Sequence, residues 1–354
     1  MKPEPDVQIL AAHWTARFTE NGIPSDDLSA TVARIGRWGD WCREWERSAG
    51  ENVRRADAAQ EIGAALTAAE LRLVAALEYH FGKFLFVDDQ ATLGRVTALA
   101  ADTYRQASTQ LPWPAQQLAV RFERRELPGV LRLPEGEAGA VPAVIVVPGL
   151  DATKEEMHRF SEVFLRRGMA TFTFDGPGQG EVEQVMPLRP DWEAVAAAAL
   201  DTLTGRPEIA ADRIAAVGVS LGGYFAARAA AAEPRLRAVA CVGGCFSLAR
   251  SWPTLSALSR AAFTVRSGAA SDDEARQVAG SFSLAGLSPK GGVPVLVVHG
   301  QQDRLFEPAQ ARAMADHFGT WAALLMEERG NHVLHNLAYR VRPAIADWVA
   351  AQLA

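Results

Sequence analysis

The sequence predicts an α/β protein in which a mostly parallel sheet, covered by helices on both faces, follows an all-helical domain. Two observations support this prediction. Up to about residue 110, apolar residues recur at the three- and four-residue steps of helices. Beyond that point, short continuously apolar runs alternate with longer helical patterns, as in sheets whose parallel strands are joined by crossover helices. We therefore expect two domains, at residues 1–112 and 113–354.

The first domain is expected to be a bundle of about four or five helices. Ala, Arg, Glu and Leu dominate it, and Leu66, Leu73 and Leu77 follow one another at steps of seven and four. Pro112 and Pro114 end the pattern, because proline cannot continue a helix. Three tryptophans also follow helical spacing, and we interpret them as packing residues on one helix face rather than as a stacking platform for a substrate: Trp38, Trp41 and Trp45.

The second domain alternates expected strands with expected helices. Residues 143–147 (AVIVV) are continuously apolar, which is typical of a strand buried on both faces. Residues 246–290 interrupt the alternation with mixed helical and Ser/Gly-rich sequence, so we expect an insertion there near the active site, over the carboxyl edge of the sheet. The expected strands are 118–124, 129–133, 143–147, 169–174, 213–219, 237–242, 293–298 and 321–326, and the expected helices are 155–167, 191–204, 221–232, 308–318 and 336–352.

The composition favours a globular protein with neither a nucleic-acid nor a membrane partner. Lys and Arg number 36 against 42 Asp and Glu, a net charge of −6, which disfavours binding to a polyanion. No run of about 18 apolar residues could form a membrane-spanning helix. Three cysteines are too few for a disulfide framework, and the opening MKPEPDVQILAAHW lacks the pattern of a signal peptide. We therefore expect a cytoplasmic protein with a small-molecule substrate.

A glycine-rich segment at residues 175–181 (DGPGQGE) follows an expected strand. A dinucleotide-binding loop would need G-x-G-x-x-G at the start of a helix, whereas this segment has G-x-G-x-G, and Pro177 lacks the N–H that a phosphate would bind. We interpret the segment as a structural turn at the carboxyl edge of the sheet. Because no Cys and His residues have the spacing of a zinc site either, we expect no cofactor and no metal ion.

The strongest functional motif is GVSLG at residues 218–222. A strand is expected before it and an Ala-rich helix after it, which is the setting of a nucleophile elbow. The turn between them is so tight that the residues two before and two after the serine must be small, and Gly218 and Gly222 meet this requirement. The motif therefore predicts the α/β-hydrolase fold, with Ser220 as the nucleophile.

A serine hydroxyl needs a base, and the base needs an acid that orients it. In this fold both follow the nucleophile along the chain, first the acid and then the histidine, in loops after later strands. Asp303 and His332 each come shortly after an expected strand, so we expect them to be the acid and the base. His335 is an alternative base, ranked second because it would begin the last helix.

Stabilisation of a developing oxyanion needs two backbone N–H groups. One belongs to the residue after the nucleophile, which is Leu221. The other is expected in the loop at residues 148–151 (PGLD), after the strand at 143–147. Leu150 is the expected donor there, and Gly149 is the alternative.

Two groups of residues are candidates for substrate binding. The first places polar side chains in the apolar run LEYHFGKFLF, where the alternative interpretation is a histidine satisfied within the core. The second follows the strand expected at 237–242 and could line a pocket. The six candidates are Tyr79, His80, Lys83, Cys245, Arg250 and Trp252.

Five segments together resemble a known family: PGLDATKEE at 148–156, FDGPGQGE at 174–181, GVSLGGY at 218–224, HGQQD at 299–303 and GNHVLHN at 330–336. Along its whole length the sequence is similar to the α/β-hydrolases with an N-terminal helical domain. This group includes 2,6-dihydroxypseudooxynicotine hydrolase, the fungal hydrolases that shorten polyketides, and the FrsA-like esterases. The serine motif and the His and Asp elements are shared by all α/β-hydrolases, whereas the first two segments are much more specific.

The resemblance implies Ser220 as nucleophile, Asp303 as acid and His332 as base. It also implies a homodimer, with the helical domain as a cap and a substrate cleft between the two domains. Several members cleave a carbon–carbon bond next to a ketone and others cleave esters, so we expect C–C bond hydrolysis of a ketone or β-diketone, with a carboxylesterase as the alternative. Acyl transfer or cyclisation on the same scaffold, and a binding protein without catalysis, are the remaining alternatives.

The sequence departs from one branch of this family. In the nicotine-degrading branch, a carboxylate after the sixth strand is considered to assist the substrate. Here residues 246–252 read FSLARSW, with Ser251 near that place and no Asp or Glu. The departure argues against nicotine-type chemistry and leaves the expected hydrolase mechanism unchanged.

Overall fold

The computed structural model describes residues 5–136 and 139–354, and the chain divides into two compact units. The helical unit consists of Met1–Ala115 together with Glu155–Arg159. The sheet unit consists of Gln116–Lys154 and Phe160–Ala354. The first division of the chain thus falls after Ala115, whereas the sequence predicted residue 112.

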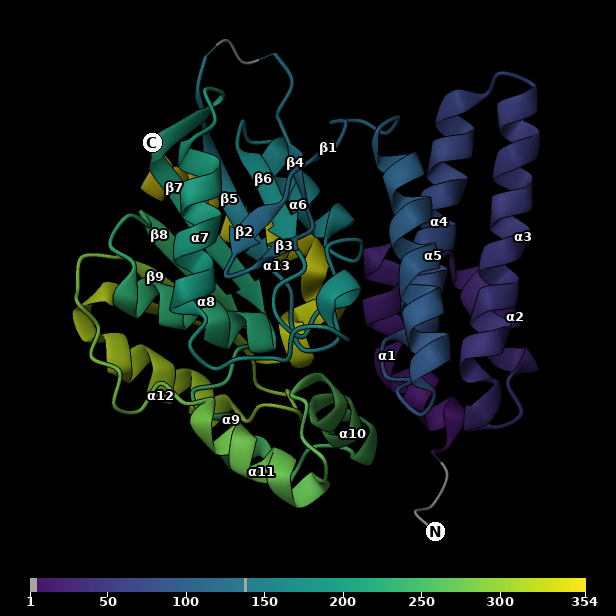
Figure 1. The fold of residues 1–354 in the computed structure, drawn as a ribbon. Helices are drawn as coiled ribbons and strands as arrows, with labels where there is room; N and C mark the ends of the chain where they lie inside the picture. Colours follow the sequence, from purple (N-terminus) through teal and green to yellow (C-terminus); the bar gives the residue numbers. More distant parts are fainter. Residues whose placement is uncertain (1–4, 137–138) are drawn as a thin grey trace. The chain divides into compact units, whose positions relative to one another are not determined.

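The helical unit contains five α-helices and one short 3₁₀ helix in the part of the chain that the structure describes (Figure 1). Its Ala- and Leu-containing segments form long helices because both residues have a high helix propensity. Asp6 and Asp89 cap the first and the fifth helix, since each carboxylate accepts two N–H groups of the first turn. The elements are α1 (Val7–Asn21), α2 (Ser25–Arg34), η1 (Trp38–Asp40), α3 (Trp41–Glu61), α4 (Ala65–Lys83) and α5 (Gln90–Ser108).

Aromatic rings fill the core of the helical unit. Phe18 of α1 contacts Phe81 of α4, with ring centroids 4.6 Å apart. Trp41 and Trp45, both on α3, lie 5.9 Å apart and are fully buried. Trp38 lies 5.4 Å from Trp41 but belongs to η1. The three tryptophans therefore pack together, as expected, without sharing one helix.

The leucine spacing in α4 did not predict which leucines are buried. Leu73 and Leu77 lie in the core, whereas Leu66 is 51% exposed. Leu66 lies in the first turn of α4, and Ile62, just before the helix, is 83% exposed. This end of the helix is open to solvent. The leucine spacing therefore predicted the helix correctly but did not show that Leu66 would be exposed.

A buried carboxylate holds residues 155–159 in the helical unit. Glu156 accepts hydrogen bonds from the guanidinium of Arg17 at 2.6 and 2.7 Å and from the amide of Asn21 at 2.8 Å. His80 Nε2 lies 2.8 Å from the same carboxylate. Burial opposes ionisation, but the charge and hydrogen bonds of Arg17 outweigh it and hold the pKa of Glu156 well below its usual range. The helix predicted from residue 155 accordingly begins later, at His158.

The sheet unit is built on an eight-stranded, mostly parallel sheet with the strand order β1-β4-β6-β5-β7-β8-β9-β10 (Figure 1). The antiparallel pairs, β1 with β4 and β4 with β6, lie at one edge, and all other neighbours are parallel. This agrees with the fold predicted from the alternation of strands and helices. The strands are β1 (Gln116–Gln117), β4 (Gly129–Arg132), β5 (Val141–Val147), β6 (Ala170–Phe174), β7 (Ile209–Val219), β8 (Ala238–Val242), β9 (Val295–Gly300) and β10 (Ala322–Glu327).

One predicted strand, at residues 118–124, does not join the main sheet. Instead β2 (Val120–Phe122) pairs with β3 (Arg125–Leu127) in a separate antiparallel hairpin. Glu123 at the turn has a φ of 53°, in the left-handed region that tight hairpin turns require. The alternation of apolar and charged residues indicated a half-buried strand but could not specify its partner.

Helices cover both faces of the sheet (Figure 1). α7 (Glu193–Thr204) and α8 (Leu221–Ala232) pack on one face, and α13 (Ala338–Leu353) lies behind the other. The segment expected as an insertion at 246–290 contains three helices. The remaining elements are α6 (His158–Leu165), η2 (Gly180–Val182), α9 (Leu248–Ser251), α10 (Ala257–Arg266), α11 (Asp272–Ser281), α12 (Pro308–Phe318), η3 (Gly319–Trp321) and η4 (His332–Leu337).

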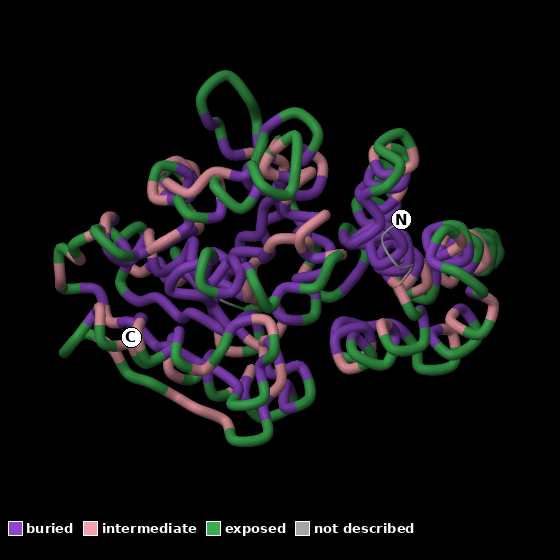
Figure 2. The backbone as a smooth tube through the Cα atoms, turned by 90° about the horizontal axis from the view of Figure 1, so that it is seen from below, coloured by how far each residue is buried: buried purple, intermediate pink, exposed green. Residues whose placement is uncertain are grey.

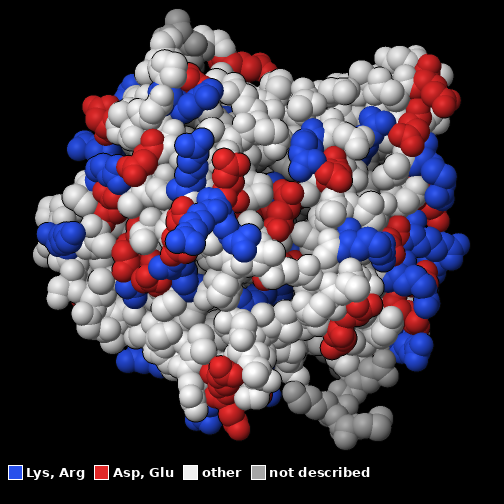
Figure 3. All heavy atoms as spheres, viewed as in Figure 1, with Lys and Arg blue, Asp and Glu red and all other residues white. Residues whose placement is uncertain are grey.

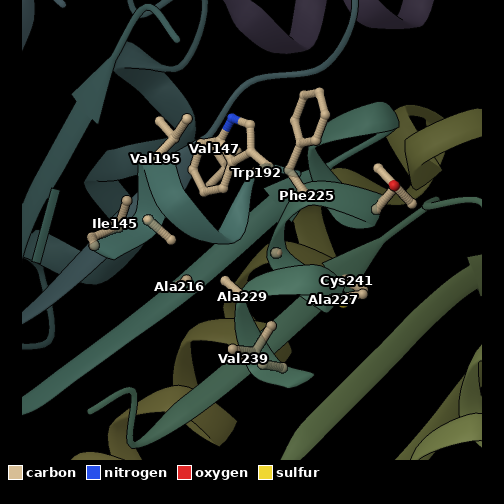
Figure 4. Close-up of a cluster of buried hydrophobic side chains, with 14 of the residues drawn as sticks. Ile145, Val147, Trp192, Val195, Ala216, Phe225, Ala227, Ala229, Val239 and Cys241 are labelled. Carbon is tan, nitrogen blue, oxygen red and sulfur yellow. The ribbon is translucent and has the colours of Figure 1, made fainter. Parts of the chain in front are cut away.

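The core between the sheet and these helices contains stacked aromatic rings. Trp192 stacks on Phe225 with centroids 5.4 Å apart, and both are buried. Figure 4 shows these rings together with buried side chains of three central strands, among them Val147 of β5, Ala216 of β7 and Cys241 of β8. Burying an aromatic or branched apolar side chain contributes roughly 1.5–3 kcal/mol. The central strands, whose carboxyl ends carry the loops described below, are therefore held in a tightly packed core.

The burial pattern follows the layers of the fold. The inner strands β5, β6, β8 and β9 are almost entirely buried, whereas the edge strands β1 and β10 are exposed or half-buried. Figure 2 shows buried chain in the interior of the sheet unit and exposed chain mainly at its periphery. Basic and acidic side chains intermix on the face shown in Figure 3. The cysteines are free and buried: Cys42, Cys241 and Cys245. Among the described residues, no helix combines the length and the apolar character that spanning a membrane would require.

Candidate active site

Ser220 lies at the turn between β7 and α8, where the backbone is strained. Its φ of 57° and ψ of −126° are values that residues other than glycine rarely adopt. Two glycines make this turn possible. A Cβ on Gly218 would lie 1.9 Å from the carbonyl oxygen of Gly222, and a Cβ on Gly222 would lie 2.2 Å from that of Val147. The serine motif thus has the geometry of a nucleophile elbow.

The imidazole of His332 reaches this serine. Its Nε2 atom lies 2.8 Å from Ser220 Oγ. His332 begins η4, in the loop after β10, and is buried. The next two residues, Val333 and Leu334, have φ angles of 58° and 57°, in the left-handed region that side chains of their kind rarely adopt. The backbone strain of this loop is therefore located directly beside the imidazole.

The carboxylate of Asp303 contacts the other side of the imidazole. Its Oδ2 atom lies 2.8 Å from His332 Nδ1, while Oδ1 accepts the backbone N–H groups of Leu305 and Phe306 at 2.9 and 3.0 Å. Burial opposes ionisation, but the charge and hydrogen bond of His332 outweigh it and lower the pKa of Asp303. Asp303 is therefore a carboxylate at neutral pH and orients the ring.

A second histidine, which the sequence analysis did not single out, lies beside the same carboxylate. His299 Nε2 is 2.8 Å from the carbonyl oxygen of Phe306 and 3.4 Å from Asp303 Oδ2. Burial lowers the pKa of His299, so the ring is neutral and donates its Nε2 proton to that carbonyl. The HGQQD segment was the available signal, because it contains both His299 and Asp303, and the hydrogen bond closes the segment from His299 to Phe306 around Asp303.

The loops that carry Asp303 and His332 are bonded to each other. The N–H of Gln302 donates to the carbonyl of Gly330 at 2.9 Å. The two chains approach so closely that a Cβ on Gly300 would lie 2.2 Å from the same carbonyl oxygen. Since β9 and β10 are parallel, both loops leave the sheet at the same edge.

This chain of hydrogen bonds can move a proton. Because the carboxylate of Asp303 accepts the Nδ1 proton of His332, the Nε2 lone pair faces the hydroxyl of Ser220. The imidazole can then take the serine proton as the oxygen attacks an electrophile. The ring whose nitrogens lie 2.8 Å from both partners is that of His332, and not that of the alternative, His335.

Backbone N–H groups lie next to the serine hydroxyl. Leu221 follows Ser220 at the N-terminus of α8, whose dipole favours negative charge. The loop after β5 passes directly by the serine, since a Cβ on Gly149 would lie 3.5 Å from Ser220 Oγ. Within the described ranges, no backbone acceptor takes the N–H of Leu150 or of Leu221. Both groups could therefore donate to an oxygen bound at Ser220.

Three of the substrate-binding candidates follow β8. Cys245 is fully buried, and burial raises the pKa of its thiol. Trp252 is also buried and packs edge-to-face on Phe263, with centroids 5.6 Å apart. Arg250 is exposed, and its guanidinium lies 5.2 Å from the ring centroid of Phe246. A part for these residues in substrate binding stays a prediction.

The other three candidates lie on α4 in the helical unit. Tyr79, His80 and Lys83 are all buried. His80 contacts the carboxylate of Glu156, as described above, which corresponds to the alternative of a histidine satisfied within the core. Their role in substrate binding likewise stays a prediction.

Two buried or half-buried carboxylates of the sheet unit converge on a lysine. Lys154 Nζ lies 2.7 Å from an oxygen of Asp175 and 2.7 Å from an oxygen of Glu181. These two carboxylates and that of Glu155 form a cluster whose oxygens lie within 4.8 Å of one another, and the ammonium group of Lys154 is bonded to two of the three. The segment at 175–181, interpreted from the sequence as a structural turn, is thus bonded to the loop after β5.

Comparison with known proteins shows related enzymes. Residues 11–258 match the family described as esterase FrsA-like, and residues 190–354 match the prolyl oligopeptidase family. The chain is 33% identical over 354 residues to 2,6-dihydropseudooxynicotine hydrolase of Paenarthrobacter nicotinovorans, an alignment that covers 99% of this chain and 93% of that protein. It is 34% identical over 239 residues to hydrolase LUC6 of a Fusarium species, covering 63% of this chain and 57% of the fungal protein.

Comparison with solved structures also identifies a related hydrolase. The crystal structure of the 2,6-dihydroxy-pseudo-oxynicotine hydrolase matches with a TM-score of 0.88 and 31% sequence identity, over 96% of both chains. The fold, the serine elbow and these matches define an α/β-hydrolase. The chain belongs to the FrsA-like family, and it is a hydrolase enzyme. The resemblance and the fold class predicted from the sequence are both confirmed.

Proposed function

We propose that this protein is a serine-dependent hydrolase of a carbonyl compound, with Ser220 as nucleophile, His332 as base and Asp303 as the acid that orients the base. One observation carries the proposal. An unbroken chain of hydrogen bonds runs from Ser220 Oγ through His332 to Asp303, with 2.8 Å at each step. A serine hydroxyl needs such a chain to become a nucleophile at neutral pH.

The first half of the proposed reaction forms an acyl-enzyme. Ser220 Oγ attacks the carbonyl carbon, its proton passes to His332 Nε2, and an electron pair of the C=O bond moves to the oxygen. The N–H groups of Leu221 and of Leu150, or of Gly149 as the alternative, donate to this oxyanion. As the C=O bond re-forms, the bond to the leaving group breaks and the leaving group takes the proton from His332.

The second half consumes one water molecule. His332 takes a proton from the water, and the resulting hydroxide adds to the acyl carbon. The intermediate collapses, Ser220 Oγ leaves with the proton from His332, and a carboxylic acid is released. Asp303 stays ionised throughout and stabilises the imidazolium that forms in each half.

The substrate class that we propose is a ketone or β-diketone of an aromatic or polyketide compound, cleaved at the C–C bond next to the carbonyl. The 33% identity to 2,6-dihydropseudooxynicotine hydrolase along 99% of the chain supports this class. In such a cleavage the leaving group is a carbanion, which must be stabilised as an enolate or by an aromatic ring. His332 or a bound water then supplies the proton to carbon.

Hydrolysis of a carboxylic ester is the second candidate, favoured by the match of residues 11–258 to an esterase family. Both reactions use the same nucleophile and differ in the leaving group, which is an alkoxide for an ester. Parallel assays with p-nitrophenyl acetate and benzoylacetone separate them. Cleavage of the diketone supports C–C hydrolysis, whereas ester turnover without diketone cleavage supports the esterase.

Replacement of the nucleophile tests the whole proposal. Ser220→Ala is expected to lower turnover by roughly 10⁴- to 10⁶-fold with an unchanged melting temperature, because the attacking oxygen is lost. A fluorophosphonate probe is expected to label wild-type protein at Ser220, as located by peptide mass spectrometry. Ser281→Ala, at an exposed serine of α11, is the control and keeps both properties.

Three outcomes would contradict this proposal in different ways. Turnover that survives Ser220→Ala, or labelling at another residue, would remove Ser220 from the mechanism. A folded wild-type protein that no probe labels would favour a binding protein without catalysis.

We also propose a role for the helical domain, an oligomeric state and a cellular location. Residues 1–112 act as a cap and dimerisation domain, a role that the family resemblance supports and that light scattering tests through the mass of a homodimer. A cytoplasmic location is compatible with the free and buried cysteines, since a reducing compartment preserves thiols.

A further inference from the structure

Gln179 is bonded to the loop that carries the proposed oxyanion donors. Its side-chain NH₂ group donates to the carbonyl oxygen of Pro148 at 2.8 Å and to that of Gly149 at 2.7 Å. Its Oε1 atom accepts the N–H of Gly176 at 2.9 Å. The side chain is buried, with 1% of the residue exposed. Both donor protons of one buried amide are thus used on two consecutive peptide groups.

These carbonyls set the direction of two N–H groups. In a planar trans peptide the C=O and the N–H point in opposite directions. The carbonyl of Gly149 therefore fixes the direction of the Leu150 N–H, and the carbonyl of Pro148 fixes that of the Gly149 N–H. These are the two alternatives for the second oxyanion donor. We propose that Gln179 is a positioning residue that holds this donor toward Ser220, an inference that rests on the proposed function.

The turn that carries Gln179 is itself held in place. The backbone N–H of Gln179 donates to the carbonyl of Gly176 at 2.9 Å, which closes a four-residue turn. Asp175, just before this turn, accepts the backbone N–H of Lys154 at 3.0 Å and its ammonium group at 2.7 Å. The loop at 148–154 is therefore bonded to Gln179 at its start and to Asp175 at its end.

A fixed donor stabilises an oxyanion more than a mobile one, because no reorganisation is needed when the charge develops. A neutral amide suits the position, since it offers two protons to two neighbouring carbonyl oxygens. Methionine at 179 would have a similar length but no donor. Glutamate would direct a carboxylate at two carbonyl oxygens. Either change would leave buried carbonyls without a partner, and their peptides would rotate toward other donors together with the N–H groups.

The test compares Gln179→Met with a matched control, Tyr224→Phe, in the full-length protein. Tyr224 is buried in the sheet unit, and its hydroxyl donates to the carbonyl of Pro190 at 3.0 Å. The control therefore also removes a hydrogen bond from a side chain to a backbone carbonyl, here a partly buried one in a different loop, together with the bond that the hydroxyl accepts from Arg228 at 3.2 Å. Gln179→Glu is a second variant, in case the methionine variant does not fold.

Two measurements distinguish orientation of the oxyanion donors from general stability. The first is kcat and KM for p-nitrophenyl acetate. The second is the affinity for trifluoroacetophenone. When this ketone binds, Ser220 Oγ adds to its carbonyl carbon, the serine proton passes to His332, and the carbonyl oxygen becomes an oxyanion. Its affinity therefore reports the same donors as the transition state does.

Gln179→Met is expected to lower kcat about 30-fold while KM changes less than about threefold, because only the transition state uses the donors. The affinity for trifluoroacetophenone is expected to fall by a similar factor. Tyr224→Phe is expected to keep all three values within about twofold. Gln179→Glu is expected to behave like Gln179→Met, with a loss that deepens as the pH rises and the new carboxyl ionises.

Unchanged kcat and ketone affinity in a folded Gln179 variant would overturn the inference. A loss confined to KM, or an equal loss in Tyr224→Phe, would overturn it as well. A failure of the proposed function is distinguishable from these results. If the proposed function is wrong, the wild-type protein is not labelled at Ser220, or Ser220→Ala keeps its turnover. If only the role of Gln179 is wrong, Ser220 is labelled and Ser220→Ala loses its turnover as expected.

Discussion

The two carboxylate oxygens of Asp303 have different partners, and this difference decides which nitrogen of His332 carries a proton. Oδ1 accepts the backbone N–H groups of Leu305 and Phe306, and Oδ2 faces His332 Nδ1. An amide in place of the carboxylate has only one oxygen. That oxygen is expected to stay with the two backbone donors, so the NH₂ group would face the imidazole.

Asp303→Asn is therefore expected to lower kcat by about 10³- to 10⁴-fold, with a small change in melting temperature. With an NH₂ group against Nδ1, the proton of His332 moves to Nε2, which can no longer accept the proton of Ser220. The measurements are kcat for p-nitrophenyl acetate and the rate of fluorophosphonate labelling. Asp316→Asn, at an exposed position of α12, is the control. Wild-type labelling of Asp303→Asn would contradict this role.

Residues defined by a short motif could be predicted from the sequence, and residues defined by tertiary contacts could not. Ser220 stands in a five-residue pattern, and Asp303 and His332 were expected because each follows a strand. Gln179 lies in FDGPGQGE, one of the segments that carry the family resemblance, but that segment does not reveal its role, because its carbonyl partners lie 30 and 31 positions earlier in the chain. The glycine-rich segment around it indicated a turn but not what the turn holds.

Among the elements, the turn from β7 to α8 constrains the loop after β5 as well as Ser220. The first turn of α8 presses on the chain that leaves β5, since a Cβ on Gly222 would lie 2.2 Å from the carbonyl oxygen of Val147 and 2.6 Å from that of Pro148. Both contacts are with backbone atoms, which cannot move aside as a flexible side chain can. The elbow and the loop with the oxyanion donors therefore act as one packed element.

Gly222→Ala is expected to lower the free energy of unfolding by about 1–3 kcal/mol, because the added methyl group overpacks this contact. It is also expected to slow fluorophosphonate labelling, since the loop at residues 148–151 must shift. Urea unfolding and labelling rates measure the two effects. Gly280→Ala on α11 is the matched control, because a Cβ there meets no atom within 4 Å. Its stability is expected to stay equal or to rise by up to about 1 kcal/mol.

The elements themselves were predictable where apolar runs determine them. β5 and the helix α8 were expected because their sequences are apolar or Ala-rich over several residues. The β2–β3 hairpin and the late start of α6 were not, because a cross-strand partner and the buried carboxylate of Glu156 decide them. Periodicity reports which face is apolar, but not which distant group an ionised side chain will meet.

In the molecule as a whole, each unit has its own core and its own buried ionisable groups. The change of composition near residue 110 was visible in the sequence, whereas the inclusion of residues 155–159 in the helical unit was not. In that unit the side chain of Glu78, on α4, is buried against α3. Ser48 Oγ donates to it at 2.7 Å and Asn52 Nδ2 at 2.9 Å. Among the described residues no ion pair to Glu78 joins these two hydrogen bonds, and the charge of Arg55 acts on it more weakly than burial does. The stability of the unit therefore depends on the protonation of this carboxyl.

Burial raises the pKa of Glu78 from 4.5 to about 7, against the hydrogen bonds of Asn52 and Ser48. Between these two pH values the folded state holds a proton that the unfolded state has released. The stabilising contribution is therefore complete below pH 4.5, declines as the pH rises to about 7, and is lost above it. Glu78→Gln keeps both hydrogen bonds, because the amide accepts from Asn52 and donates to the hydroxyl of Ser48, but it cannot ionise.

Relative to the wild type, Glu78→Gln is expected to gain about 2–4 kcal/mol of stability in the helical unit between pH 4.5 and pH 8. Hydrogen exchange of peptides from α3 and α4, followed across this pH range, measures the effect in that unit alone. The same difference taken on peptides of β7 and β8 is the internal control and is expected to be flat. Parallel profiles of the two proteins on α3 and α4 would show that Glu78 ionises normally, and that a water-filled or open helix pair rather than a packed one surrounds it.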